Sequence, residues 1–377
     1  MSGNLSRHHL PLRTAGRGGF TLVEMLVASS ILLVIIGILF TITQETSKVW
    51  SNAAGKVEVF RGARTGFDAA TRTLSQATLN TYYDYFDANG VPASSSSYTG
   101  TPVTYGRQSH LQLVTGQGST LLTGLTGYTP VTHAAFFQAP LGVTATSSNI
   151  DLGSLLNSCG FYIVYGPDNT QPNFVSSGTR YRYRLMQFIQ PSDSLSVYVS
   201  GNKGSSNWYL PAIKSDLTSA ASNSNFVLAE NVIALVFLPK LASQDEAAAD
   251  TAYGLSAPMG TALAPSYAYD STSVGQGGSI NSSTGLSMYP MLNSFNQLPP
   301  VVQVTMVAID EASAVRLGNA ATPPNAKLGL TSTLFTQAKN YQADLNAMMA
   351  TLAANHINYR VFQTDVAIRG AKWTANN

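Results

Sequence analysis

The apolar positions of this chain are concentrated in one run near its start. From Phe20 to Ile42 the sequence has 23 residues and a single charged side chain, Glu24. A helix of roughly 20 apolar residues is long enough to cross the hydrocarbon core of a bilayer. The run therefore predicts a membrane-spanning helix over residues 20–42.

A second apolar pattern follows over residues 43–80. Small and large apolar side chains recur there at three- and four-residue steps, at Ala53, Val57, Phe60, Ala63, Phe67, Ala70, Leu74 and Ala77. This spacing is typical of an amphipathic helix. It predicts one helix from about Phe20 to about Leu79, roughly 90 Å long at 1.5 Å per residue. The alternative is a membrane anchor and a separate core helix, with a break at Gly55, Gly62 or Gly66.

After residue 80 the pattern changes to short apolar or alternating runs between turn-forming residues, which is typical of strands. The continuous apolar run 232–237 predicts a central strand, and the alternation of 181–186 with arginine predicts a half-exposed one. The predicted strands are residues 109–115, 132–138, 160–166, 180–189, 195–200, 226–238, 301–309 and 359–369.

Two further segments complete the predicted fold. Residues 333–355 have the apolar spacing of a helix, and residues 241–300 are rich in Ala, Ser, Gly, Thr and Tyr. The latter composition predicts a long surface insertion with little regular structure. The predicted class is α+β: a long N-terminal helix, then an exported antiparallel β-rich domain over residues 81–377.

The charges in front of the apolar run predict its orientation. Residues 1–19 contain Arg7, Arg13 and Arg17 and no acidic residue. By the positive-inside rule this end stays cytoplasmic and the chain after Ile42 is exported. In an ordinary secretory signal the cleavage site follows the apolar region. Here the candidate site, between Gly19 and Phe20, precedes it, so cleavage would remove residues 1–19 and keep the helix.

Glu24 is the one charge in the predicted span. A carboxylate at the centre of a membrane helix costs about 2.5–3.5 kcal/mol, but near the helix start the N-terminal dipole favours an anion. After cleavage the new amine of Phe20 lies one helical turn away. It is a natural partner for Glu24 of a neighbouring subunit, and such a pair would set the register between helices. The alternative is that Glu24 lies at the interface of an uncleaved anchor.

The run Gly19-Phe20-Thr21-Leu22-Val23-Glu24 resembles the class III signal of type IV pilins and type II secretion pseudopilins. The resemblance implies that a prepilin peptidase cuts after Gly19 and methylates the amine of Phe20. It also implies that Glu24 aids entry into the growing filament. The implied protein is single-pass in the inner membrane, with a periplasmic domain. Its implied partners are other pilins or pseudopilins and the inner-membrane assembly platform.

Weaker resemblances concern the later part of the chain. The run 72–77 near the helix end, followed by antiparallel strands, looks like the J-type minor pseudopilin, which implies a place in or at the tip of a periplasmic filament. Residues 333–364 look like the pilin-like cassette proteins of Verrucomicrobia. Two alternatives remain: an adhesin displayed on a pilus, with 241–300 as its recognition loop, or a membrane-tethered exported enzyme. The chain also lacks a proline between Pro11 and Pro92, unlike many major pilins.

The composition of the chain limits the classes of partner that we expect. Charged residues form 11% of the chain, against about 25% in typical soluble domains. The formal net charge is +2, and the three leader arginines leave the rest near neutral, so we expect no nucleic-acid partner. Cys159 is the only cysteine. An intrachain disulfide is therefore excluded, and the apolar run 159–165 predicts a buried, inert thiol.

No catalytic residues and no metal ligands are predicted. The exported domain has three histidines, His110, His133 and His356, and they are not at metal-ligand spacing. Asp84, Asp87 and Asn89 before Gly90 weakly suggest a calcium loop, but their spacing differs from an EF-hand. The aromatic run 82–86 is predicted to pack where helix meets sheet, with sugar or partner binding as the alternative.

Overall fold

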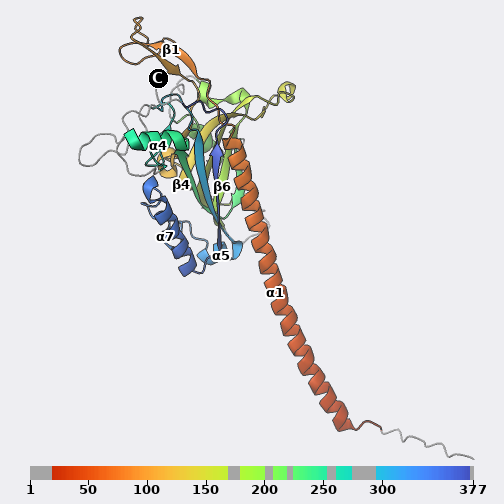
Figure 1. Cartoon of the computed structure of the whole chain (residues 1–377). Coiled ribbons are helices and arrows are strands. Elements are labelled where there is room, and N and C mark those ends of the chain that lie inside the picture. Colours follow the sequence, from red (N-terminus) through yellow and green to blue (C-terminus); the bar gives the residue numbers. More distant parts are fainter. Residues whose placement is uncertain are drawn as a thin grey trace, which may run out of the picture. The chain divides into compact units, whose positions relative to one another are not determined.

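The computed structural model describes residues 19–168, 179–199, 207–218, 224–252, 260–273 and 294–373. The chain divides into two compact units, Met1–Ala54 and Gly55–Asn377. Helix α1 (Leu22–Leu74) contributes to both, and the later described elements belong to the second unit (Figure 1).

The second unit has antiparallel sheets and short helices, as the α+β prediction requires. Its strands are β1 (Tyr82–Phe86), β2 (Thr104–Gln108), β3 (Val114–Gln117), β4 (Thr129–Pro140), β5 (Leu156–Pro167), β6 (Tyr181–Gln190), β7 (Asn225–Glu230), β8 (Val232–Lys240), β9 (Tyr269–Asp270), β10 (Val301–Ile309) and β11 (Tyr359–Ala367). Its helices are α2 (Gly118–Leu121), α3 (Leu210–Thr218), α4 (Ser243–Ala252), α5 (Glu311–Leu317), α6 (Asn325–Leu328) and α7 (Tyr341–Ala354).

The end of α1 packs into the second unit through the predicted apolar stripe. Its buried side chains are Ala63, Phe67, Ala70 and Leu74. The helix continues through Gly62 and Gly66. A Cβ at Gly66 would lie 3.3 Å from the Leu228 side chain, so a side chain here would crowd β7. The helix ends five residues before the predicted Leu79. The N–H groups of Gln76 and Ala77 bond to carbonyls three residues back, which tightens the chain before it leaves the helix.

The larger sheet has the strand order β7-β6-β5-β4-β3-β9. One face packs in the core that contains the end of α1. The other face packs under α3 and the residues before it, where the Phe136 and Tyr209 rings stack 3.7 Å apart. Because both faces are covered, Arg182 and Arg184 of β6 are buried. The prediction of a half-exposed strand at 181–186 is therefore wrong.

The smaller sheet has the strand order β11-β10-β8, with β10 in the centre. The predicted strand 226–238 is two strands, β7 in the larger sheet and β8 at the edge of the smaller one. Asn231 separates them with a φ of 59°, a left-handed conformation in which asparagine is enriched. The run 232–237 is buried, as predicted, but it is not a central strand.

Two side chains of β4 join the sheets. The register of β4 on β5 shifts between Val131 and Ala134. The Leu235 N–H of β8 donates to Thr132 Oγ1 at 3.0 Å, and the Phe237 N–H donates to His133 Nδ1 at 3.3 Å. These bonds satisfy backbone donors at a buried strand edge, which would otherwise be costly.

Other predicted segments differ in extent. The strand predicted at 195–200 is a short 3₁₀ turn at Ser196–Tyr198, and the strand predicted at 109–115 begins only at Val114. The helix predicted at 333–355 begins at Tyr341. Phe335 has a positive φ of 52°, which is incompatible with a right-handed helix, and its N–H donates to Asp344 Oδ2 at 2.9 Å.

The segment 241–300 is more ordered than a surface insertion in its described parts. It contains α4 and β9. Leu263, Tyr267 and Tyr269 are buried in the main core, and the Ala262 N–H donates to the Glu246 carboxylate at 2.9 Å. The buried tyrosine and alanine side chains of this segment are part of the core and do not belong to a solvated loop.

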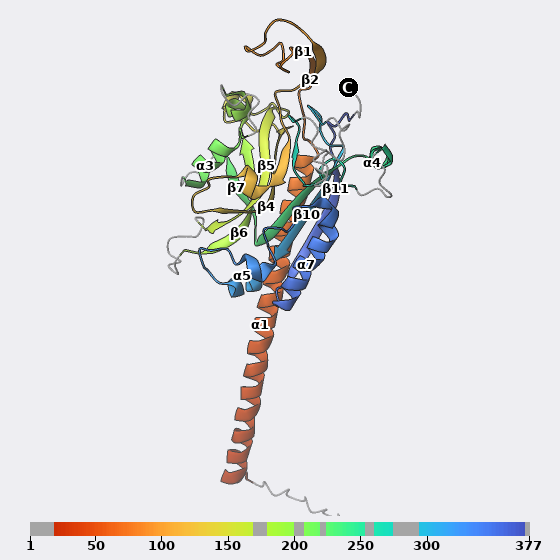
Figure 2. The same ribbon diagram turned by 90° about the vertical axis from the view of Figure 1, so that its left-hand side faces the viewer.

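Strands β1 and β2 form a separate two-stranded ribbon beyond the two larger sheets (Figure 2). Phe86 is buried and its ring lies 6.3 Å from that of Phe295. Tyr83 and Tyr85 are 61% and 55% exposed. Phe86 is therefore buried as predicted, but within the ribbon and against Phe295 rather than where helix meets sheet, and the prediction is wrong for the two exposed tyrosines.

Candidate processing and assembly site

The junction between Gly19 and Phe20 is exposed and lies in front of α1. The Phe20 side chain is 84% exposed. A Cβ added at Gly19 would meet no heavy atom within 4 Å, and Gly19 does not have a positive φ. Neither packing nor backbone conformation in this chain requires a glycine at this position, and an exposed, non-helical junction is accessible to a peptidase.

Thr21 and Glu24 form a reciprocal cap at the start of α1. The Thr21 N–H and its hydroxyl donate to Glu24 Oε2 at 2.8 and 2.9 Å. The Glu24 N–H donates back to Thr21 Oγ1 at 3.2 Å. This arrangement is a capping box, which satisfies two of the backbone donors that a helix start leaves unpaired. The spacing Thr-x-x-Glu in the sequence is its signature, although the predictions above did not include this cap.

The cap uses only one oxygen of the Glu24 carboxylate. In the part of the chain that the structure describes, no donor reaches Oε1. An ionised carboxylate has about four lone-pair sites. Glu24 can therefore cap its own helix and accept another cationic donor at the same time.

The apolar side chains of the first part of α1 are not covered by any of the residues that the structure describes. Leu22–Trp50 is long and apolar enough to cross a membrane, about 43 Å at 1.5 Å per residue. Its large apolar side chains are exposed on all sides, from 47% at Ile35 to 80% at Leu22. Such a surface is stable only when lipid or other apolar helices cover it. An apolar helix of this kind suits a membrane-anchored protein.

Several polar side chains of this segment form local hydrogen bonds. The hydroxyl groups of four residues donate to carbonyls three or four residues back: Ser29, Ser30, Thr41 and Thr43. The Glu45 carboxylate accepts from Lys48 Nζ at 3.1 Å. Glu24 is therefore the one charged group between Phe20 and Ile42, and it lies in the first helical turn.

Residues 15–40 match the family described as the prokaryotic N-terminal methylation motif. The motif and the apolar helix fit a type IV pilin-like protein. The match covers the junction, the cap and most of the apolar segment. No curated protein and no solved structure matches the chain significantly.

The remaining candidate residues have structural partners. Asp87 accepts N–H bonds from Asn89, Val91 and Thr99, which holds the turn at Gly90. Asp84 accepts from the N–H groups of Tyr85 and Ser94. Among the described residues, no group of three or more His, Cys, Asp or Glu side chains could hold a metal ion.

Cys159 and His133 are buried, and burial keeps both side chains in their neutral forms. Cys159 is buried, as predicted, and burial raises the pKa of its thiol to about 12. His133 is fully buried at the sheet junction, and burial lowers its pKa to about 4. Its Nδ1 accepts from Phe237, so Nε2 carries the hydrogen and donates to the Phe335 carbonyl at 2.9 Å. His133 is thus a neutral structural residue.

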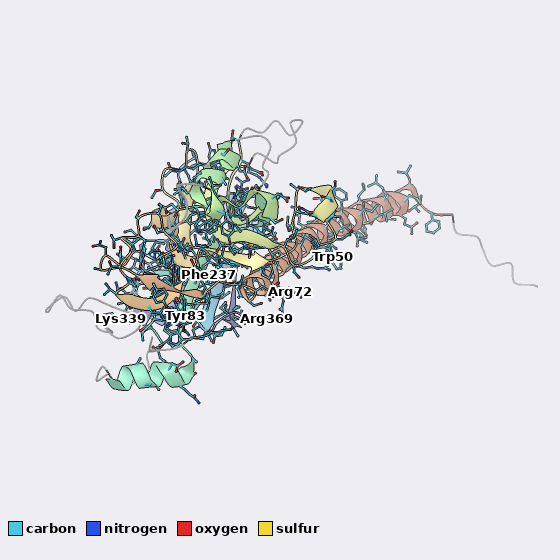
Figure 3. The ribbon with its side chains drawn as sticks, turned by 90° about the horizontal axis from the view of Figure 1, so that it is seen from above. Trp50, Arg72, Tyr83, Phe237, Lys339 and Arg369 are labelled. Atoms are coloured by element: carbon cyan, nitrogen blue, oxygen red, sulfur yellow. The ribbon has the colours of Figure 1, made fainter. Side chains whose placement is uncertain are left out.

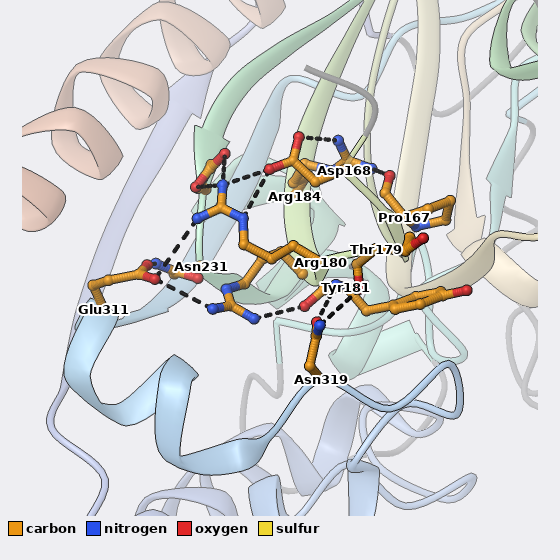
Figure 4. Close-up of polar contacts among 11 residues, drawn as sticks. Pro167, Asp168, Thr179, Arg180, Tyr181, Arg184, Asn231, Glu311 and Asn319 are labelled. Carbon is orange, nitrogen blue, oxygen red and sulfur yellow. Dashed lines mark hydrogen bonds and ion pairs between the residues drawn. The ribbon is translucent and has the colours of Figure 1, made fainter. Parts of the chain in front are cut away.

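A group of charged side chains lies at the ends of β5 and β6 (Figure 4). Arg180 Nε donates to Asp168 at 2.8 Å, and its guanidinium also pairs with Glu230 at 3.1 Å. Arg182 pairs with Glu311 of α5 at 3.3 Å. Each of these charges has an opposite charge beside it, so the group links the larger sheet to α5.

Proposed function

We propose that this protein is a minor pilin or pseudopilin, a structural subunit of a type II secretion or type IV pilus-like filament. A prepilin peptidase removes residues 1–19 and methylates Phe20, and the subunit then assembles through α1 from the inner membrane. The observation that supports this is an exposed Gly19–Phe20 junction directly before an apolar helix that none of the described residues covers.

The cap suggests how Glu24 acts during assembly. Oε2 holds the Thr21 N–H, one residue from the amine that cleavage creates at Phe20. We propose that Oε1 receives the Phe20 ammonium of a neighbouring subunit while Oε2 keeps the cap. Methylation leaves that amine able to carry its positive charge. A charge-assisted bond in an apolar surrounding is stronger than in water, so it would select one register.

The second unit fits a minor subunit, present in few copies, better than a major subunit that repeats along the filament. This unit spans Gly55–Asn377 and carries the β1–β2 ribbon in addition to two packed sheets. Close packing of α1 helices along a filament leaves limited room around each subunit for a domain of this size. A subunit present in few copies, in or at the tip of the periplasmic filament, avoids that crowding.

The test is incorporation of Glu24→Ala into filaments, with Glu45→Ala as the matched control. Glu45 is also an exposed glutamate on α1, but it pairs with Lys48. We expect Glu24→Ala to insert and to be cleaved normally, yet to reach sheared filaments at less than a tenth of the wild-type level. Glu45→Ala should incorporate normally. Equal incorporation of the two variants would contradict the proposed role of Glu24.

A further inference from the structure

Three exposed tyrosines lie on one face of the β1–β2 ribbon. Tyr85 is directly opposite Tyr105 in the register, and Tyr83 is two residues from Tyr85 and so on the same face. The Tyr105 ring lies 5.3 Å from that of Tyr83 and 5.1 Å from that of Tyr85. We call these three residues the tyrosine platform.

The platform does more than hold the ribbon together. Cross-strand aromatic pairs stabilise a two-stranded ribbon, which accounts for the contacts between the rings. It does not account for their outer faces, because Tyr83, Tyr85 and Tyr105 remain 61%, 55% and 61% exposed. None of their hydroxyl groups has a hydrogen-bond partner among the described residues.

A cavity of about 350 Å³ adjoins the platform. Tyr83 lines it and also stacks on Tyr105, so cavity and platform are continuous. The segment after β11 forms part of the wall as it passes the end of α1, where the Arg369 N–H donates to the Ser75 carbonyl at 3.0 Å (Figure 3). Asn296 and Gln297 add polar atoms to the lining.

The charge of this cavity is positive. Its lining includes Arg107, which is opposite Tyr83 in the ribbon register, and the exposed Lys372. No acidic residue is among the described residues that line it. An anionic group is therefore favoured in the cavity, and Arg and Lys recognise carboxylates through charge-assisted hydrogen bonds.

We propose that the platform and cavity bind an acidic sugar chain, one built of uronic acid units. The apolar C–H faces of the sugar rings stack on Tyr83, Tyr85 and Tyr105, because an aromatic face is negative and attracts them. The tyrosine hydroxyl groups bond to sugar hydroxyls. The exposed Lys372 takes a carboxylate, and the charge of the buried Arg107 nearby favours an anion there. An apolar peptide would leave the tyrosine hydroxyl groups and the Lys372 ammonium without matching groups.

The test is calorimetric titration of the full chain in detergent micelles with the tetrasaccharides of galacturonic acid and mannuronic acid. Cellotetraose is the neutral comparison. We expect at least one acidic tetrasaccharide to bind with a Kd below about 1 mM and at least ten times more tightly than cellotetraose. Tyr83→Ala and Tyr105→Ala should each weaken binding at least tenfold. Tyr198→Ala, which removes a partly exposed tyrosine outside this cavity lining, should not.

Lys372→Gln tests the positive charge alone. Lys372 is exposed, so its replacement removes the charge and leaves the ribbon intact. It should reduce the preference for acidic over neutral chains to less than threefold. Lys327→Gln, at an exposed lysine of α6 outside the cavity lining, should leave the preference unchanged. The proposal is overturned if neither acidic tetrasaccharide binds below that limit, or if cellotetraose binds equally well. It is also overturned if folded Tyr83→Ala binds as the wild type does.

Discussion

At the scale of single residues, Glu24 is the clearest case of one side chain with an intrachain contact and a proposed intersubunit contact. Its position in the sequence predicted only the second. The intrachain cap with Thr21 follows from the same six residues, since Thr-x-x-Glu before an apolar run is a known helix-start pattern. This contact was therefore predictable. The partner of Oε1 belongs to another subunit and cannot be derived from one chain.

His133 shows what a sequence does not reveal about a buried polar residue. Its role depends on the register shift in β4, which turns its ring toward the edge of β8. That strand is about a hundred positions away in the chain. The absence of metal-ligand spacing around His133 indicated only that it is not a predicted metal ligand, and gave no positive role.

We predict that His133 makes folding sensitive to acid. The pKa is about 4 in the folded chain and near 6.5 when unfolded, so the unfolded chain binds the proton first as the pH falls. Its contribution is fully present above about pH 6.5 and declines toward pH 4. Between pH 7 and pH 5 the free energy of unfolding should fall by about 2 kcal/mol because of this group.

The measurement is urea unfolding of wild type, His133→Gln and His110→Gln at pH 7 and pH 5. The pH-dependent loss should be about 2 kcal/mol smaller in His133→Gln, and His110→Gln should behave as the wild type does. If His133→Gln loses as much stability as the wild type between these two pH values, the neutral structural role of His133 is wrong.

At the scale of elements, periodicity predicted α1 and most strands because burial there follows the pattern of single segments. The strands predicted at 132–138, 160–166, 180–189, 301–309 and 359–369 are all present. Strands β4 and β5 extend beyond the predicted limits, β6 is shifted by one residue, β10 matches and β11 ends two residues earlier. The split of 226–238 was not predictable from hydrophobicity, since the apolar pattern continues nearly unbroken across the left-handed Asn231. The exposure of the tyrosine platform was not predictable from the sequence either, because aromatic runs are typical of core strands.

The ion-pair group that links β6 to α5 supports a prediction at this scale. Asp168 is buried and pairs with Arg180 and Arg184. Removing one partner of a buried pair leaves an uncompensated charge. We expect Asp168→Asn to lower the free energy of unfolding by about 3 kcal/mol and the exposed Asp151→Asn to change it by less than about 0.5 kcal/mol. Urea unfolding at pH 7 measures both, and equal stability of the two variants would contradict a stabilising role of the Asp168 ion pairs.

At the scale of the whole molecule, few charges are left for electrostatic contacts with partners. The chain has 11% charged residues, and several of them pair with one another in the partly buried group around Asp168. Among the described residues, the apolar part of α1 and the tyrosine platform with its cavity are both exposed. We assign the first to assembly and the second to recognition of a ligand.

The most direct test of the central claim is the mass of the mature N-terminus. The full chain is produced together with a prepilin peptidase, and its intact mass and N-terminal peptide are measured. We predict loss of residues 1–19 and one added methyl group on Phe20. Gly37→Val, at another glycine with open space around it, should be processed normally, whereas Gly19→Val should not be cleaved. An intact residue 1–19 segment on the wild-type chain, or cleavage at another bond, would contradict the account.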